Sequence, residues 1–249
     1  MLPKVHWRHW PGDTDRPALA LHCMMASAAY WGPLAGRMNG RVDLRGFDMP
    51  GHGRSAAWQP GDTDFHTAVT RIAAGAIDRP IDLIGHSIGA TVALRIAVAA
   101  PEAVRSLTLI EPVLFAAAGG WARDIDPATD EEAAARAFLG VWGASRYDDL
   151  PPAAQAAVRL QIWLVKETAP TLNDDAARIL RPDGLESIDA PVMLISGQDS
   201  PPLIHRIAEN LAARLPDVGI ATVEGAGHMA PITHPDQVAG LIAVNLDRA

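Results

Sequence analysis

The chain has 249 residues, of which 49% are hydrophobic, and a formal net charge of −8 without any long acidic block. This composition supports a large buried core and excludes a disordered chain, while the acidic excess argues against nucleic acid or an anionic membrane as partner. The only cysteine, Cys23, excludes an internal disulfide framework, and no apolar run is long enough for a transmembrane helix or signal peptide. The sequence therefore predicts a soluble, cytoplasmic protein.

Short apolar runs alternate along the chain with longer segments of helical periodicity. Several of the short runs are apolar on both faces, as expected of a parallel sheet that helices cover on both sides. The predicted strands are Ala18–His22, Val42–Gly46, Ile81–Gly85, Leu107–Ile110, Val192–Ser196 and Ile220–Val223.

The segments between these strands carry apolar residues at helical spacing. The predicted helices are Thr63–Ala76, Ser87–Ala99, Leu203–Leu215 and Gln237–Leu246. Alternation of this kind predicts a three-layer α/β/α domain around a mostly parallel central sheet.

The segment from Pro112 to Asp189 contains no convincing strand. Its periodicity instead predicts three helices, which cover Glu131–Val141, Ala153–Val165 and Leu172–Leu180. We therefore expect a helical insertion at residues 112–189, between two late strands of a core domain formed by residues 1–111 and 190–249.

Ser87 stands between Gly85 and Gly89 where a predicted buried strand gives way to a predicted buried helix. A G-x-S-x-G string in this context is typical of a nucleophile elbow, a turn so tight that the flanking glycines must lack side chains. The turn projects the serine hydroxyl above the sheet, next to the free N–H groups at the start of the helix.

At this point the sequence resembles the α/β-hydrolase family along nearly its whole length. Four further stretches support the resemblance: Leu21-His22-Cys23-Met24 after the first clear strand, Phe47–Ser55 (FDMPGHGRS), Ile195–Asp199 (ISGQD) and Glu224–Met229 (EGAGHM). The resemblance implies that the insertion at 112–189 is a cap over the active site.

The resemblance also implies a catalytic triad in the chain order serine, acid, histidine. His228 is the expected base because it follows a late strand and a glycine-rich loop. The acid remains open between Glu111, at the end of a strand, and Asp199. The family's usual G-x-x-D spacing would put the acid at Ser200, one place after Asp199.

The oxyanion formed on serine attack requires backbone donors. The resemblance assigns these to the N–H groups of Ile88 and Met24. Cys23 departs from the family's glycine in this loop, which requires either an ordinary backbone conformation at Cys23 or strain.

The expected substrate site is apolar, with walls from the loop after the first strand and from the cap. The residues predicted to bind substrate are Met25, Trp31, Phe138, Trp142, Trp163 and Met229, with Met24 and Trp121 beside them. The sequence has no P-loop, dinucleotide-binding turn or metal-spaced His/Cys pair, so we expect neither cofactor nor metal.

The sequence predicts a serine hydrolase that cleaves a small, mostly apolar carboxylic ester through an acyl-enzyme on Ser87. A second hypothesis is a C–C bond hydrolase or lactonase of the same fold, and a third is a ligand-binding pseudo-hydrolase or receptor. The expected partner is a small-molecule substrate, and the expected assembly is a monomer or homodimer.

Overall fold

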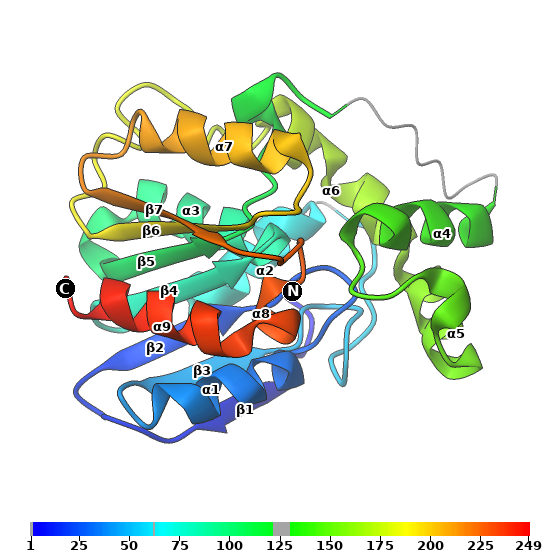
Figure 1. Cartoon of the computed structure of the whole chain (residues 1–249), viewed down its shortest axis with the longest axis horizontal. Coiled ribbons are helices and arrows are strands. Elements are labelled where there is room, and N and C mark those ends of the chain that lie inside the picture. Colours follow the sequence, from blue (N-terminus) through cyan, green and yellow to red (C-terminus); the bar gives the residue numbers. More distant parts are fainter. Residues whose placement is uncertain (1, 62, 122–129) are drawn as a thin grey trace.

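A computed structural model describes residues 2–61, 63–121 and 130–249. Within them one sheet has seven strands, in the spatial order β1-β3-β2-β4-β5-β6-β7 (Figure 1). β1 pairs antiparallel with β3, and every other neighbouring pair is parallel. The strands are β1 (Trp7–Trp10), β2 (Pro17–Leu21), β3 (Asp43–Phe47), β4 (Ile81–His86), β5 (Val104–Ile110), β6 (Val192–Gly197) and β7 (Val218–Val223).

Helices cover both faces of the sheet, which confirms the three-layer prediction (Figure 1). On one face lie α2 (Phe65–Ala74), α3 (Ile88–Ala99) and α7 (Pro202–Ala212). On the other face α1 (Gly32–Met38) packs against α9 (Pro235–Leu246), with the short α8 (Ala230–Thr233) next to it. Each face has its own apolar cluster, and β4 and β5, at the centre of the sheet, are buried almost throughout.

The helical insertion lies between β5 and β6, beyond the carboxyl ends of the strands (Figure 1). It contains α4 (Glu131–Trp142), α5 (Pro152–Gln161) and α6 (Trp163–Asp174). The predicted helix Leu172–Leu180 is wrong, because α6 ends at Asp174 and Asp175 adopts a left-handed conformation with φ 49°. The Asp175 carboxylate accepts hydrogen bonds from the N–H groups of Ile179 and Leu180, which holds the following segment as a turn.

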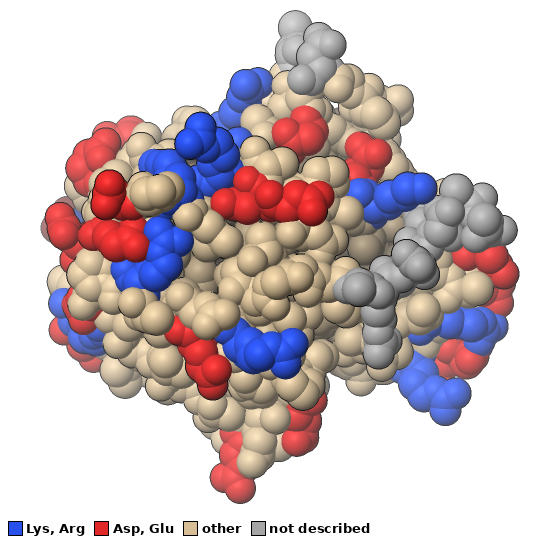
Figure 2. Space-filling model, turned by 90° about the horizontal axis from the view of Figure 1, so that it is seen from above, with Lys and Arg blue, Asp and Glu red and all other residues tan. Residues whose placement is uncertain are grey.

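The described surface shown in Figure 2 carries acidic and basic side chains side by side, without a large area of one sign. Among the described residues, no helix combines the length and apolarity that crossing a bilayer requires.

Candidate active site

Ser87 occupies a sharp turn between β4 and α3. Its backbone has φ 58° and ψ −119°, and its N–H donates to the Ile110 carbonyl on β5 at 2.9 Å. A Cβ on Gly89 would lie 2.2 Å from the Leu21 carbonyl oxygen, and one on Gly85 would lie 2.4 Å from the Gly89 oxygen. Only glycine fits at these two positions, so the flanking residues fix the turn that presents the hydroxyl.

His228 lies in the loop after β7, and its ring is paired with Glu111 at the end of β5. Nδ1 of His228 is 2.9 Å from Oε2 of Glu111, and both side chains are almost completely buried. An ionised carboxylate only accepts hydrogen bonds, so Nδ1 carries the proton and Nε2 is left free to act as a base.

The other carboxylate oxygen of Glu111 is held from β6. Oε1 accepts from the Gly197 N–H at 2.6 Å and from the Ser200 hydroxyl at 2.7 Å. Glu111 itself has φ 50°, and its N–H donates to the Ile195 carbonyl at 2.8 Å. Two donors on one oxygen and an imidazole on the other fix the orientation of this buried carboxylate.

Asp199 lies elsewhere. Its side chain is exposed, and its backbone N–H donates to the Ala226 carbonyl at 2.8 Å. Of the two acids that the sequence left open, the structure brings Glu111 to His228 and leaves Asp199 at the surface.

A neutral histidine ties the loop after β2 to the loop after β3. Nδ1 of His22 donates to the Cys23 carbonyl at 2.7 Å, and Nε2 accepts from the Met49 N–H at 2.8 Å. Burial lowers the pKa of His22 to about 3, which keeps the ring neutral. The His22 ring therefore fixes the loop that carries Met24 to the loop after β3.

The backbone strain that was considered for Cys23 occurs instead at Met25, two residues later. Met25 has φ 63°, whereas Cys23 is absent from the positive-φ residues of the described chain. Burial raises the pKa of the Cys23 thiol to about 12, so it stays protonated and unreactive.

A second buried histidine, His86, supports the loop that carries His228. Nε2 of His86 donates to the His228 carbonyl at 2.8 Å, so Nδ1 must accept from the Tyr30 hydroxyl, also at 2.8 Å. Burial lowers the pKa of His86 well below its usual value, which preserves this arrangement of protons. No motif in the sequence marks Tyr30 as a residue that supports the site.

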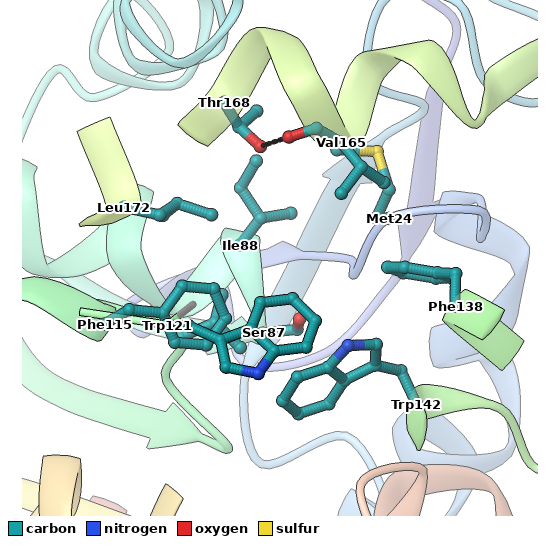
Figure 3. Close-up of a pocket in the computed structure, with 11 residues that line it drawn as sticks. Met24, Ser87, Ile88, Phe115, Trp121, Phe138, Trp142, Val165, Thr168 and Leu172 are labelled. Atoms are coloured by element: carbon teal, nitrogen blue, oxygen red, sulfur yellow. Dashed lines mark hydrogen bonds between the residues drawn. The ribbon is translucent and has the colours of Figure 1, made fainter. Parts of the chain in front are cut away.

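Ser87 opens onto two cavities. The smaller has a volume of about 40 Å³, and Figure 3 shows Ser87 facing an aromatic group that includes Phe115, Trp121 and Trp142. The larger, of about 610 Å³, is lined by Ser87 and His228 together with residues such as Met25 and Met229.

The helical insertion contacts the predicted base directly. Trp142, the last residue of α4, meets the His228 ring edge-on with centroids 4.7 Å apart. The Trp121 ring lies 5.2 Å from that of Trp142, and Phe115 packs against both.

Two predicted substrate-binding residues are corrected, since neither lines these cavities. Trp31 is only 1% exposed and packs with Leu34 and Met38 on the α1 face of the sheet. Trp163 begins α6, and its indole N–H donates to the Leu160 carbonyl at 3.1 Å. The other predicted wall residues, Met24, Met25, Trp121, Phe138, Trp142 and Met229, do line one or both cavities.

Comparison with known proteins identifies the fold family. The model of the alpha/beta hydrolase family matches residues 18–241, which is most of the chain. The chain belongs to the α/β-hydrolase family.

Several named proteins resemble the chain over nearly its whole length. A pimeloyl-[acyl-carrier protein] methyl ester esterase of Neisseria meningitidis serogroup A is 27% identical, over 92% of this chain and 76% of the relative. Lipase LipV of Mycobacterium tuberculosis is 24% identical over 99% of both chains. The carboxylesterase CesB of Bacillus subtilis superposes with a TM-score of 0.77 at 20% identity, over 98% of this chain and 88% of the other.

Within the described residues, no cluster of three or more His, Cys, Asp or Glu side chains has the arrangement of a metal site.

Proposed function

We propose that this α/β-hydrolase is a serine carboxylesterase that cleaves a small, mostly apolar ester through an acyl-enzyme on Ser87. The observation that carries the proposal is that Ser87, at a strained strand-to-helix turn, and His228, already paired with Glu111, line the same cavity. The esterases and the lipase among the relatives support the same reaction type.

In the first step Ser87 Oγ attacks the ester carbonyl carbon while its proton passes to Nε2 of His228. Glu111 accepts from Nδ1 and stabilises the imidazolium that forms. The negative charge that develops on the carbonyl oxygen is bound by the N–H groups of Ile88 and Met24. The Ile88 N–H is the first of α3 and has no acceptor within its own helix.

The imidazolium then gives its proton to the leaving alcohol, which departs and leaves the acyl group on Ser87. A water molecule, deprotonated by His228, attacks the acyl-enzyme and releases the acid. Each oxyanion donor contributes about 3 kcal/mol of transition-state stabilisation in comparable enzymes.

A fluorophosphonate probe tests the nucleophile. We expect rapid, stoichiometric labelling of Ser87, which Ser87→Ala abolishes and His228→Ala slows by orders of magnitude, in parallel with loss of p-nitrophenyl ester hydrolysis. Labelling of another residue, or full turnover in Ser87→Ala, would exclude the proposed mechanism.

The same side chains could serve a C–C bond hydrolase or lactonase. A panel of dienoic diketones and lactones, run beside the ester panel, separates these reactions from ester cleavage. The Glu111–His228 pair supports catalysis over the third hypothesis, a ligand-binding pseudo-hydrolase, because such a protein needs no acid to orient His228.

We also propose that residues 112–189 act as one cap on a core of residues 1–111 and 190–249, and that the enzyme is cytoplasmic and either a monomer or a homodimer. The single cysteine, buried and unpaired, supports a reducing compartment. Cell fractionation and light scattering of the purified protein test the location and the oligomeric state.

A further inference from the structure

Ser87 stands in the partition between two unequal cavities. Met24, Phe138 and Trp142 line both and complete this partition. We call the cavity of about 40 Å³ the chamber and the cavity of about 610 Å³ the groove. An ester bound at Ser87 must therefore extend one part into each.

The position of His228 determines which part of the ester lies in the chamber and which lies in the groove. The carbon attacked by Ser87 carries three other groups: the oxyanion, the leaving oxygen and the acyl chain. The oxyanion turns toward the Ile88 and Met24 N–H groups. The leaving oxygen must lie within hydrogen-bonding reach of His228, which lines the groove and not the chamber. The alcohol portion therefore lies in the groove, and the acyl chain enters the chamber.

The chamber limits the acyl chain by size and polarity. Its volume is far smaller than that of the groove, so it admits only a short chain beyond the carbonyl carbon. Its remaining walls include Val113, Phe115, Trp121 and Leu172. Among the described residues that line it, the one hydroxyl besides that of Ser87 is on Thr168, and it donates to the Val165 carbonyl at 2.9 Å (Figure 3). A short, apolar acyl chain fits this space, and a polar or long one does not.

The groove suits a larger and uncharged alcohol. Among the described residues that line it, none is Lys, Arg, Asp or Glu, and apolar side chains such as Met25, Leu150, Val158 and Ile232 form much of its wall. Its volume is in the range of pockets that hold drug-sized molecules.

We propose that the preferred substrates are esters of a short, apolar acid and a bulky, uncharged, mostly apolar alcohol. This inference rests on the proposed esterase function. In such an ester the alcohol is the larger part. In the methyl ester named for the Neisseria relative, the alcohol is the smaller part.

Two isomeric esters test the orientation on the wild-type enzyme. Octyl acetate and methyl nonanoate have the same formula and similar hydrophobicity but place the long chain on opposite sides of the ester. We expect kcat/KM for octyl acetate to exceed that for methyl nonanoate by at least about tenfold. Across a series of p-nitrophenyl esters from acetate to octanoate, kcat/KM should fall by a similar factor as the acyl chain lengthens.

Matched substitutions connect the preference to the two cavities. Leu172→Ala, on α6, enlarges the chamber and should shift the acyl optimum toward hexanoate, whereas Ile232→Ala, in the groove wall, should change only the dependence on alcohol length. Val165→Ala serves the same purpose as Leu172→Ala if that variant does not fold.

The outcomes of these experiments distinguish failure of this inference from failure of the proposed esterase function. A preference for methyl nonanoate, with turnover that depends on Ser87, would overturn the orientation and leave the esterase function intact. An acyl profile that neither chamber variant changes would also overturn it. Absence of Ser87-dependent hydrolysis of every ester would overturn both proposals.

Discussion

The hydroxyl of Ser200 donates to Oε1 of Glu111 at 2.7 Å, while Oε2 of the same carboxylate pairs with His228. Ser200 stands three residues after Gly197, where the usual G-x-x-D spacing of the α/β-hydrolase family would place the acid itself. β5 and β6 are neighbours in the sheet, so a side chain after either strand reaches the same point beside His228. In this chain the carboxylate that contacts His228 comes from the end of β5, and Ser200, after β6, donates a hydrogen bond to it.

Glu111→Gln tests this assignment. The amide keeps the shape of the side chain but removes the charge that stabilises the imidazolium and selects its tautomer. We expect kcat for ester hydrolysis to fall by roughly ten-thousandfold, as in other triads that lose the acid in this way. Circular dichroism and thermal unfolding should show that the variant is folded.

Asp199→Asn is the matched control, because it makes the same chemical change two residues beyond Gly197 on an exposed side chain. Its kcat should stay close to that of the wild type. Loss of activity in Asp199→Asn with retention in Glu111→Gln would reverse the assignment.

Ser200→Asp in the Glu111→Gln background should restore part of the lost activity. The new carboxylate would start from a Cα already within side-chain reach of residue 111, on the strand from which the family usually supplies the acid. A gain of at least about tenfold in kcat over Glu111→Gln alone is expected. Gln198→Asp in the same background is the control, since its exposed position should give no gain.

Strands β2, β4, β5 and β6 were predictable because each is a short apolar run buried almost throughout. All six predicted strands are confirmed within a few residues. β1 (Trp7–Trp10) was missed. It is an edge strand, paired only with β3 and exposed over most of its length, so its sequence WRHW lacks the apolar run that marked the others.

The site was predictable where a local motif fixes the backbone, as at Ser87 between its two glycines. The partner of His228 was not predictable, because the choice between Glu111 and Asp199 depends on which side chain the packing of β5, β6 and the loop after β7 turns inward. Trp31 was wrongly assigned for a similar reason, since an aromatic residue near the site in sequence can equally fill the core.

Tyr30→Phe should weaken catalysis by loosening the His228 loop. Without the tyrosine hydroxyl, the buried Nδ1 of His86 loses its donor, at a cost of roughly 1–3 kcal/mol in unfolding free energy. We expect kcat to fall by about tenfold with a smaller change in KM, as measured by steady-state kinetics. Tyr147→Phe is the control: its hydroxyl accepts from Arg159 within the helical insertion, so kcat should change little. Equal effects of the two substitutions would contradict a positioning role for Tyr30.

Gly89→Ala should prevent correct folding of the elbow. The added methyl would lie 2.2 Å from the Leu21 carbonyl oxygen, which belongs to a central strand and has no room to move. We expect a loss of several kcal/mol, about 3 or more, in chemical denaturation, or failure to express as soluble protein. Gly240→Ala on α9 meets no atom within 4 Å and should stabilise the protein by up to about 1 kcal/mol. A Gly89→Ala variant with normal stability would show that the turn is looser than its geometry indicates.

Four buried histidines predict that the protein loses stability as the pH falls below neutrality. Burial lowers the pKa of His22 and His66 to about 3 and that of His52 to about 4, and it lowers the pKa of His86 well below 6.5. Between these values and the ordinary pKa of 6.5, only the unfolded chain binds the protons. The free energy of unfolding should therefore fall as the pH drops from 6.5, by up to about 1.4 kcal/mol per pH unit for each histidine.

His66→Gln tests the contribution of one of these histidines to the pH dependence of stability, at a residue outside the proposed catalytic triad. In the wild type Nε2 of His66 donates to the Thr91 hydroxyl at 3.0 Å, and Nδ1 accepts from Arg95 at 3.2 Å, an arrangement that only the neutral ring can make. Glutamine retains a donor and an acceptor but does not titrate. Urea unfolding at pH about 7.5 gives the packing cost of the substitution, since neither state then carries much of the proton. Between pH about 6 and 5 the variant should lose stability less steeply than the wild type, by about 1.4 kcal/mol per pH unit. Parallel curves for the two proteins would mean that His66 takes up its proton in the folded state as readily as in the unfolded chain.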